Sequence, residues 1–194
     1  MNLVTLLEYK ENQGISSTKE DVRIDSLITS VSQLVKTYCG QRIIDYYTDP
    51  ITELHTILPG TYAIQLNEGP VVAITSVEER SFGGDYILLD ETKGDYYLDA
   101  GTDMLYRAQA TGYKNWAHGP GAVRIIYTGG YQETPEDLKL AIYDLITYYL
   151  KDEHKMRRSL SGASIDNQGT SSQSQNVGFP DHIKRVLDLY KVIL

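Results

Sequence analysis

Apolar residues recur with helical spacing over residues 134–154, the most clearly delimited pattern in the chain. Thr134 is a preferred N-cap residue, Pro135 suits the first helical turn, and Asp137 can reach back as in a capping box. The apolar positions form two neighbouring stripes, namely Leu138, Ala141, Ile142, Leu145 and Tyr149, and then Leu140, Tyr143, Ile146 and Leu150. A helix with two apolar stripes must be covered on two sides. We therefore predict a central helix that the rest of the chain covers.

Two further helices are predicted ahead of it. Residues 3–13 carry the weak pattern of a short helix that ends at Gly14. Residues 17–20 read Ser-Thr-Lys-Glu, a capping box, and a single apolar stripe follows up to Tyr38 before Gly40. The opposite face of this second helix is polar, which predicts that it faces water or a polar partner.

The hydrophobic period changes from helical to two between residues 43 and 131. Alternation at 62–66 and apolar runs at 71–77 and 123–128 predict strands, with a turn at 67–70. The segments 86–89 and 96–98 flank the polar residues 90–95 and predict a hairpin. Short strands at this spacing indicate an antiparallel sheet, inserted between the N-terminal helices and the central helix.

The composition changes again after the central helix. Residues 159–178 are rich in Ser, Gly, Asn and Gln and predict a flexible loop, whereas residues 179–194 carry one apolar face and predict a final helix. The fold class is therefore α+β, mainly an α-helical bundle with an inserted antiparallel β subdomain. We expect a single domain with parts at 1–42 (N-terminal helices), 43–132 (β subdomain), 133–158 (central helix), 159–178 (loop) and 179–194 (C-terminal helix).

Composition limits the classes of function. The 194 residues carry a net charge of −8, which argues against binding nucleic acid by phosphate neutralisation but is compatible with DNA sliding past. The single cysteine, Cys39, excludes an intramolecular disulfide and is expected to be a small core residue. No apolar run is long enough to span a bilayer, and the N-terminus lacks the features of a signal peptide, so we expect the chain to stay in the compartment where it is made. Tyrosine is frequent, with 16 residues against 2 Phe, as is common on sheet faces and at interfaces.

A search for catalytic or metal-binding motifs is negative. The four histidines have no ligand spacing, and the common nucleophile, zinc and phosphate-loop motifs are missing, so we expect no cofactor, no metal and no enzymatic activity. Residues 90–99 are acidic enough to suggest a calcium loop, but Gly94 stands where an EF-hand needs a ligand, which favours a plain hairpin. Trp116 and the Tyr-rich strands could form a sugar or peptide platform, although a sheet face packed on helices explains them more simply.

An ordered set of segments carries a resemblance to a known family. It consists of the capped N-terminal helix pair, residues 69–77 (GPVVAITSV), 97–99 (YLD), 123–131 (VRIIYTGGY), 135–142 (PEDLKLAI) and 179–187 (FPDHIKRVL). Together they resemble the head-to-tail connector, or adaptor, proteins of tailed bacteriophages over nearly the whole chain. The resemblance implies a structural virion protein in the neck between capsid and tail, made in the host bacterial cytoplasm. It also implies a ring, of dodecameric copy number, beneath the portal protein, which extends the DNA channel and supports stopper or tail proteins.

Two interfaces are expected on this basis. The inter-subunit surface is assigned to Leu140, Tyr143 and Ile146 of the second stripe, or to the polar face of the helix at 17–39. The portal surface is assigned to the C-terminal region, and its candidate residues are Gly178, Phe179, Tyr190, Ile193 and Leu194. The main alternative is a Tyr-rich ligand- or peptide-binding module of a phage tail or cell-surface assembly, and an enzyme of undetected mechanism comes last.

Overall fold

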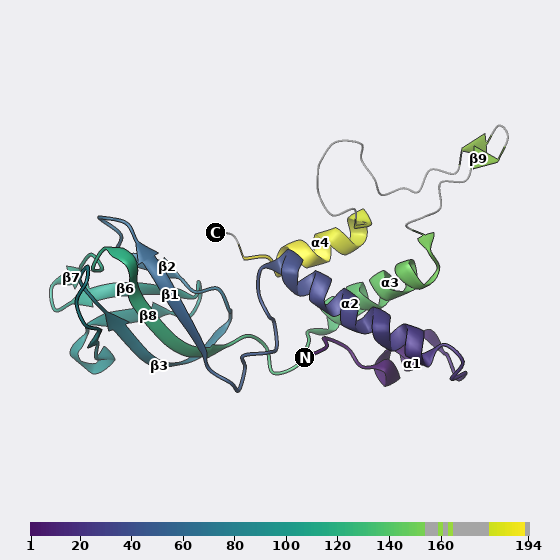
Figure 1. The fold of residues 1–194 in the computed structure, drawn as a ribbon, viewed down its shortest axis with the longest axis horizontal. Coiled ribbons are helices and arrows are strands. Elements are labelled where there is room, and N and C mark those ends of the chain that lie inside the picture. The colour runs from purple at the N-terminus through teal and green to yellow at the C-terminus, as the bar shows by residue number, and fades with distance from the viewer. Residues whose placement is uncertain (154–158, 161–162, 165–178, 193–194) are drawn as a thin grey trace. The chain divides into compact units, whose positions relative to one another are not determined.

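The computed structural model describes residues 1–153, 159–160, 163–164 and 179–192, and its ribbon is drawn in Figure 1. Two compact units make up the chain. The helical unit combines residues 1–40 with the described residues from 134 onwards, and the β unit holds residues 41–133. The β unit is thus an insertion between two helices of the other unit, and each unit is described by itself below.

Four helices build the helical unit: α1 (Leu6–Gln13), α2 (Asp21–Cys39), α3 (Glu136–Leu150) and α4 (Asp181–Leu189). All four were predicted from their apolar periodicity, and α1 and α2 end at the expected glycines. Both Gly14 and Gly40 adopt the left-handed conformation that closes a helix without a Cβ penalty. Cys39 is fully buried, as expected for a core residue, and burial raises the pKa of its thiol to about 12.

The predicted capping boxes of α2 and α3 are wrong, whereas α1 carries one that the sequence reading missed. Helix α3 has Pro135 at its N-cap and no side-chain cap, and the Thr134 hydroxyl donates to the Leu3 carbonyl at 2.5 Å. The side chain of Thr5 instead accepts the Glu8 amide at 3.2 Å, and the Glu8 carboxylate accepts the Thr5 amide at 2.7 Å. At α3, Thr134 therefore makes a long-range contact, and the expected local cap is not formed.

Helix α3 is covered by its neighbours within the helical unit. The Tyr9 ring of α1 lies 6.1 Å from the Tyr143 ring, and its hydroxyl is 3.0 Å from the Thr147 hydroxyl. On another side, the Tyr190 hydroxyl after α4 donates to the Asp137 carboxylate at 2.6 Å. Most of the two stripes is covered by α1, α2 and α4 of the same chain, whereas Leu140 of the second stripe remains 57% exposed.

The β unit contains two four-stranded antiparallel arrangements. The first sheet has the order β1-β8-β3-β4, with strands β1 (Ile51–Ile57), β8 (Gly119–Gly129), β3 (Val71–Glu79) and β4 (Ile87–Leu88). The second has the order β2-β6-β5, and β7 also pairs with β6, with strands β2 (Ala63–Gln65), β6 (Met104–Gln109), β5 (Tyr96–Asp99) and β7 (Gly112–Tyr113). The inner faces of both sheets contribute to one apolar core.

Antiparallel pairing was predicted correctly, but the hairpin at 86–98 was not. Strand β4 pairs with β3, and β5 pairs with β6, so the two expected arms belong to different sheets. The intervening residues include a 3₁₀ turn, η1 (Glu91–Lys93), in which the Asp90 carboxylate accepts the Thr92 amide at 2.9 Å. The turn is closed by its own side chains and forms neither a hairpin tip nor an EF-hand loop.

The fold class is α+β, as predicted, but the description as mainly helical overstates the helices, because strands occupy a similar share of the described residues. The predicted flexible loop at 159–178 falls almost wholly outside the described residues. Two short antiparallel strands, β9 (Ser159–Leu160) and β10 (Ala163–Ser164), are described within it.

Candidate interaction surfaces

The three residues predicted at the inter-subunit surface lie on α3 but differ in exposure. Leu140 is 57% exposed, Tyr143 is buried beneath α1, and Ile146 is 0% exposed inside the helical unit. The side chains of Tyr143 and Ile146 are therefore packed inside the subunit and are not exposed to a partner. A contact at this part of α3 would be carried by Leu140.

The five residues predicted at the portal surface are only partly described. Gly178, Ile193 and Leu194 lie outside the described residues. Phe179 is buried, with its ring packed edge-on against Tyr38 at 5.1 Å, so it anchors the start of α4 within the helical unit. Tyr190 keeps part of its surface, while its hydroxyl is bound as described above.

A shallow groove on the helical unit lies between the start of α2 and the end of α3. Its lining includes Lys19, Val22, Arg23 and Tyr149. The Arg23 guanidinium donates to the Leu150 carbonyl at 3.0 Å and so closes the C-terminal end of α3. Arg23 and Ser26 belong to the polar face of α2, a candidate for the subunit seam, and they line this groove together with Val22 and Leu27.

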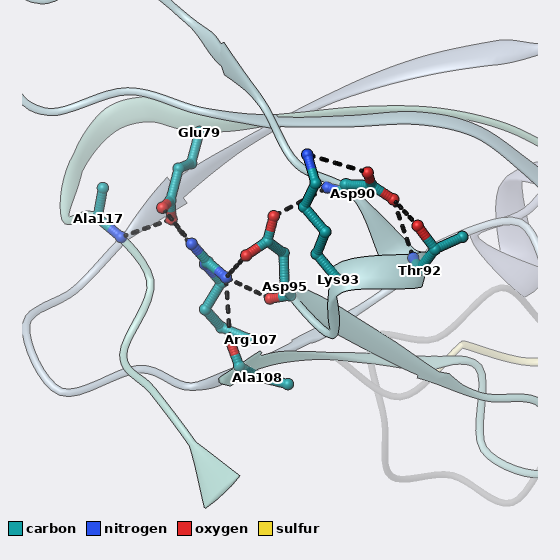
Figure 2. Close-up of polar contacts among 8 residues, drawn as sticks. All are labelled: Glu79, Asp90, Thr92, Lys93, Asp95, Arg107, Ala108 and Ala117. Atoms are coloured by element: carbon teal, nitrogen blue, oxygen red, sulfur yellow. Dashed lines mark hydrogen bonds and ion pairs between the residues drawn. The ribbon is translucent and has the colours of Figure 1, made fainter. Parts of the chain in front are cut away.

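A buried ion-pair network lies in the β unit, around Arg107 of β6 (Figure 2). The guanidinium binds the Glu79 carboxylate through two hydrogen bonds, from Nε at 3.1 Å and from Nη2 at 2.7 Å. It also donates to the Asp95 carbonyl and, at 3.0 Å, to the Ala108 carbonyl. These groups tie β3 and β6 to the residue before β5, and four of the five N–H groups of Arg107 are engaged. The one N–H that remains cannot form a bidentate pair with a ligand carboxylate or phosphate.

A second buried polar cluster joins β1, β8 and the turn before β3. The Tyr127 hydroxyl donates to the Glu53 carboxylate at 2.5 Å and accepts the Glu68 amide at 2.9 Å, while His55 lies 2.9 Å from Glu53. Burial raises the pKa of the Glu68 carboxyl to about 7, although the hydrogen bond from the Arg42 amide at 2.7 Å opposes the shift. Sequence reasoning missed this cluster because its members are scattered along the chain. Its groups satisfy one another, which is typical of structural polar networks.

Four tyrosines form a cluster on the outer face of the second sheet, Tyr62, Tyr97, Tyr106 and Tyr113, called the tyrosine cluster below. The Tyr106 ring lies 6.2 Å from Tyr62, 6.5 Å from Tyr97 and 5.2 Å from Tyr113, so it is the centre of the group. Tyr97 and Tyr113 are 55% and 63% exposed. The sequence favours a Tyr-rich sheet face packed on helices over an open Tyr-rich platform. In the β unit this tyrosine face is exposed.

The outer face of the first sheet presents a different surface. Leu54, Arg124, Glu78 and Leu88 are register partners across all four strands. Arg124 forms an ion pair with Glu78, and its guanidinium lies 4.2 Å from the centre of the Tyr86 ring. This face is aliphatic at its two edges and carries an ion pair in the middle.

The described residues form neither a metal-binding cluster nor a membrane-spanning helix. No group of three or more His, Cys, Asp or Glu in the described ranges is arranged to hold a metal ion. None of the helices described is long and apolar enough to cross a membrane.

Comparison with known proteins places this fold. The chain is 22% identical to the head completion protein of Escherichia phage T5 over 194 residues, which covers 98% of this chain and 99% of that one. Among solved structures, it is similar to a chain in the neck of an empty gene transfer agent particle computed with C6 symmetry, with a TM-score of 0.57 at 13% identity over 99% of this chain and 91% of that one. A chain in the neck of the native particle, computed with C12 symmetry, gives a TM-score of 0.56 at 12% identity over 100% and 95% of the two chains. At these identities the structures show a shared fold.

The family follows from the sequence profile. The profile of the head completion protein family matches residues 2–193, which is almost the whole chain. The phage connector resemblance noted in the sequence is thereby confirmed. The chain belongs to the head completion protein family, and so to the structural, non-enzymatic proteins of the head–tail region of phage particles.

Proposed function

We propose that the protein is a head-to-tail connector that forms a ring beneath the portal, extends the DNA channel and provides the platform for stopper or tail proteins. The observation that carries the proposal is the family match over residues 2–193, together with a fold shared with neck chains of particles computed with C6 and C12 symmetry. A protein of the virion neck with cyclic relatives has its simplest assembly in a closed ring of head-to-tail contacts.

The charge of the chain supports a passive role towards DNA. A net charge of −8 gives little basis for phosphate neutralisation, so DNA can pass such a ring without being held by it. Sequence-specific contact with DNA is not part of the proposal.

Portal docking is assigned to the C-terminal region. The contacts of α4 separate residues that hold the helix in its own subunit from residues that can contact the portal. Phe179 and Tyr190 fasten the helix to α2 and α3, and the Val192 amide donates to the Cys39 carbonyl at 2.9 Å. The helix is thereby positioned within its own subunit. The proposed portal contact is therefore made by residues beyond these anchors, which include Gly178, Ile193 and Leu194.

The test of the ring proposal uses DNA-filled heads that carry the portal but lack this protein. Purified protein is added, the heads are pelleted, and the necks are imaged by electron microscopy. We expect a ring of cyclic symmetry beneath the portal and restored attachment of tails, whereas heads without portal bind none. Protein that binds tails but not portal-bearing heads would overturn the proposal.

Two truncations test the portal assignment. One deletes residues 164–176, and the other removes only Ile193 and Leu194, so that the Tyr190 and Val192 contacts with the helical unit remain. We expect both proteins to keep their circular dichroism spectrum and to bind heads at least tenfold more weakly. Unchanged binding by both would move the docking surface elsewhere, for example to the N-terminal helices.

A further inference from the structure

The β unit exposes two opposite faces, because the inner faces of its two sheets share one core. On the second sheet, Tyr97 and Tyr106 are register partners, and both point away from that core. On the first sheet, Leu54 and Leu88 mark the two edges of the outward row and are 62% and 67% exposed. Large apolar side chains are therefore exposed on both sides of the same unit. A face that is exposed in the subunit and rich in such residues is typical of an interaction site.

The two faces differ in charge. Asp99 follows Tyr97 on the outward side of β5, and its carboxylate is bound only by the Gly101 amide and the Thr102 hydroxyl of its own turn. Among the described residues it has no ion-pair partner. The tyrosine cluster therefore carries a negative charge at its border.

On the opposite face, Arg80 is the unpaired cation. Its guanidinium donates to the Gly121 carbonyl at 3.2 Å and lies 4.7 Å from the centre of the Tyr86 ring, on which Arg124 also stacks. Arg124 is neutralised by Glu78, whereas Arg80 forms no ion pair within the described residues. We call this surface, formed by Leu54, Arg80, Tyr86, Arg124 and Leu88, the arginine face.

We propose that the tyrosine cluster of one subunit packs against the arginine face of the next copy in the ring. The inference rests on the ring of the proposed function and assigns part of its seam to the β unit. A closed ring needs two different surfaces that fit each other, and the β unit offers them on opposite sides. Guanidinium groups stack on tyrosine rings, and the spare cation on one face matches the spare carboxylate on the other.

The arginine face of a second copy is a better partner for the tyrosine cluster than the tyrosine cluster of that copy. In a two-fold contact, the Asp99 carboxylates of both copies, which are bound only within their own turns, would approach the same seam, and this repulsion is unfavourable. The area also fits a partial seam. The three most exposed rings, Tyr62, Tyr97 and Tyr113, offer roughly 300 Å² together, less than half of the roughly 800 Å² per partner of a stable interface. The β-unit contact therefore adds to a seam that also needs the helical unit.

Cross-linking on assembled heads tests the pairing. Tyr113→Cys and Leu88→Cys are combined in one chain, bound to portal-bearing heads and treated with a short bismaleimide. Both positions are exposed, and the native Cys39 is buried with a raised pKa, so it does not compete. We expect a ladder of covalent oligomers up to the ring, whereas each single variant gives no ladder. The matched control pairs Tyr113→Cys with Leu7→Cys, a position of the helical unit that is about as exposed as Leu88, and should give no ladder.

A charge variant gives a second readout. Arg80→Glu should reduce the amount of ring on heads at least tenfold while the circular dichroism spectrum of the subunit stays unchanged. Dimers from Tyr113→Cys alone would show a symmetric contact, and a cross-link to portal or tail protein would show a different occupant, so either result overturns the inference. A wild-type ring without any ladder refutes the seam but leaves the connector function intact, whereas absence of a wild-type ring refutes both.

Discussion

Replacing Arg107 by methionine tests whether the buried network of Figure 2 holds the β unit together. The Arg107 side chain is 6% exposed, and that of its partner Glu79 is 14% exposed. Methionine keeps the apolar stem but removes all four hydrogen bonds from the guanidinium. Glu79 is then left as a buried carboxylate that retains one long contact, from the Ala117 amide at 3.4 Å.

The expected loss is about 3–5 kcal/mol of unfolding free energy, the usual result when one partner of a buried ion pair is removed. Adding Glu79→Met removes the unpaired charge, and we expect it to restore about 2–3 kcal/mol. Recovery stays incomplete, because the Asp95 and Ala108 carbonyls still lack the donors that Arg107 gave them, at a cost of about 1 kcal/mol each. The double variant should therefore unfold between the wild type and the single variant.

The assay is urea unfolding followed by fluorescence of Trp116, the only tryptophan, which is buried in the β unit 5.8 Å from the Arg107 guanidinium. Arg124→Met is the matched control, because the Arg124–Glu78 pair lies on the exposed face and should contribute less than about 1 kcal/mol. A loss below about 1 kcal/mol for Arg107→Met, or equal losses for both arginines, would refute the argument.

Three further changes have expected outcomes. Burial raises the pKa of Glu68 from its ordinary value of 4.5 to about 7, so its stability contribution is complete below pH 4.5 and is lost as pH rises through 7. Glu68→Gln removes this titration, and in urea titrations its unfolding free energy minus that of the wild type should increase by about 3 kcal/mol from pH 4 to 8. Gly130→Ala would place a Cβ 2.2 Å from the Ile43 carbonyl at a φ of +93°, so urea unfolding should show a loss of at least about 2 kcal/mol, against about 1 kcal/mol for Gly83→Ala in open space. Thr5→Ala removes the cap of α1, and circular dichroism should report about 1 kcal/mol less stability while tryptophan fluorescence is unchanged.

Helices were predictable because their signals are local. Apolar spacing gave all four helices, and a glycine in the left-handed conformation ends α1 and α2 where expected. At the start of α3 the expected Thr134 cap is missing, and the Thr134 hydroxyl binds Leu3, a residue 131 positions away. No local rule weighs such a partner against a cap.

Strand β1 was not predicted, because polar residues occupy inward positions of the strand. Its inward positions include Glu53 and His55 in place of the apolar residues that a period-two search expects. Glu53 is tolerated there because Tyr127 of β8 binds its carboxylate. The strand is recognisable only after its partner is known.

The tyrosine cluster was partly predictable from composition but not from position. Tyr96 and Tyr97 are adjacent and look equivalent in the sequence, yet Tyr96 is buried in the core and Tyr97 faces outwards. Tyr62, directly before β2, and Tyr113 of β7 reach the same cluster because β2 and β7 both pair with β6. Strand register, which sets the side of each residue, decides which tyrosines form a surface.

The preference for tyrosine over phenylalanine fits a subunit that exists free before it assembles. Exposed phenylalanine rings have no polar group that water can bind, so a cluster of them would favour non-specific association. Tyrosine presents a similar ring area but keeps a hydroxyl that stays hydrated in the free subunit and finds a partner in an interface. The chain has 16 Tyr against 2 Phe, and three of the four rings in the tyrosine cluster are about half exposed or more. Such a surface is compatible with a folded subunit in water and still has the ring area and edge polarity that a neighbouring copy needs.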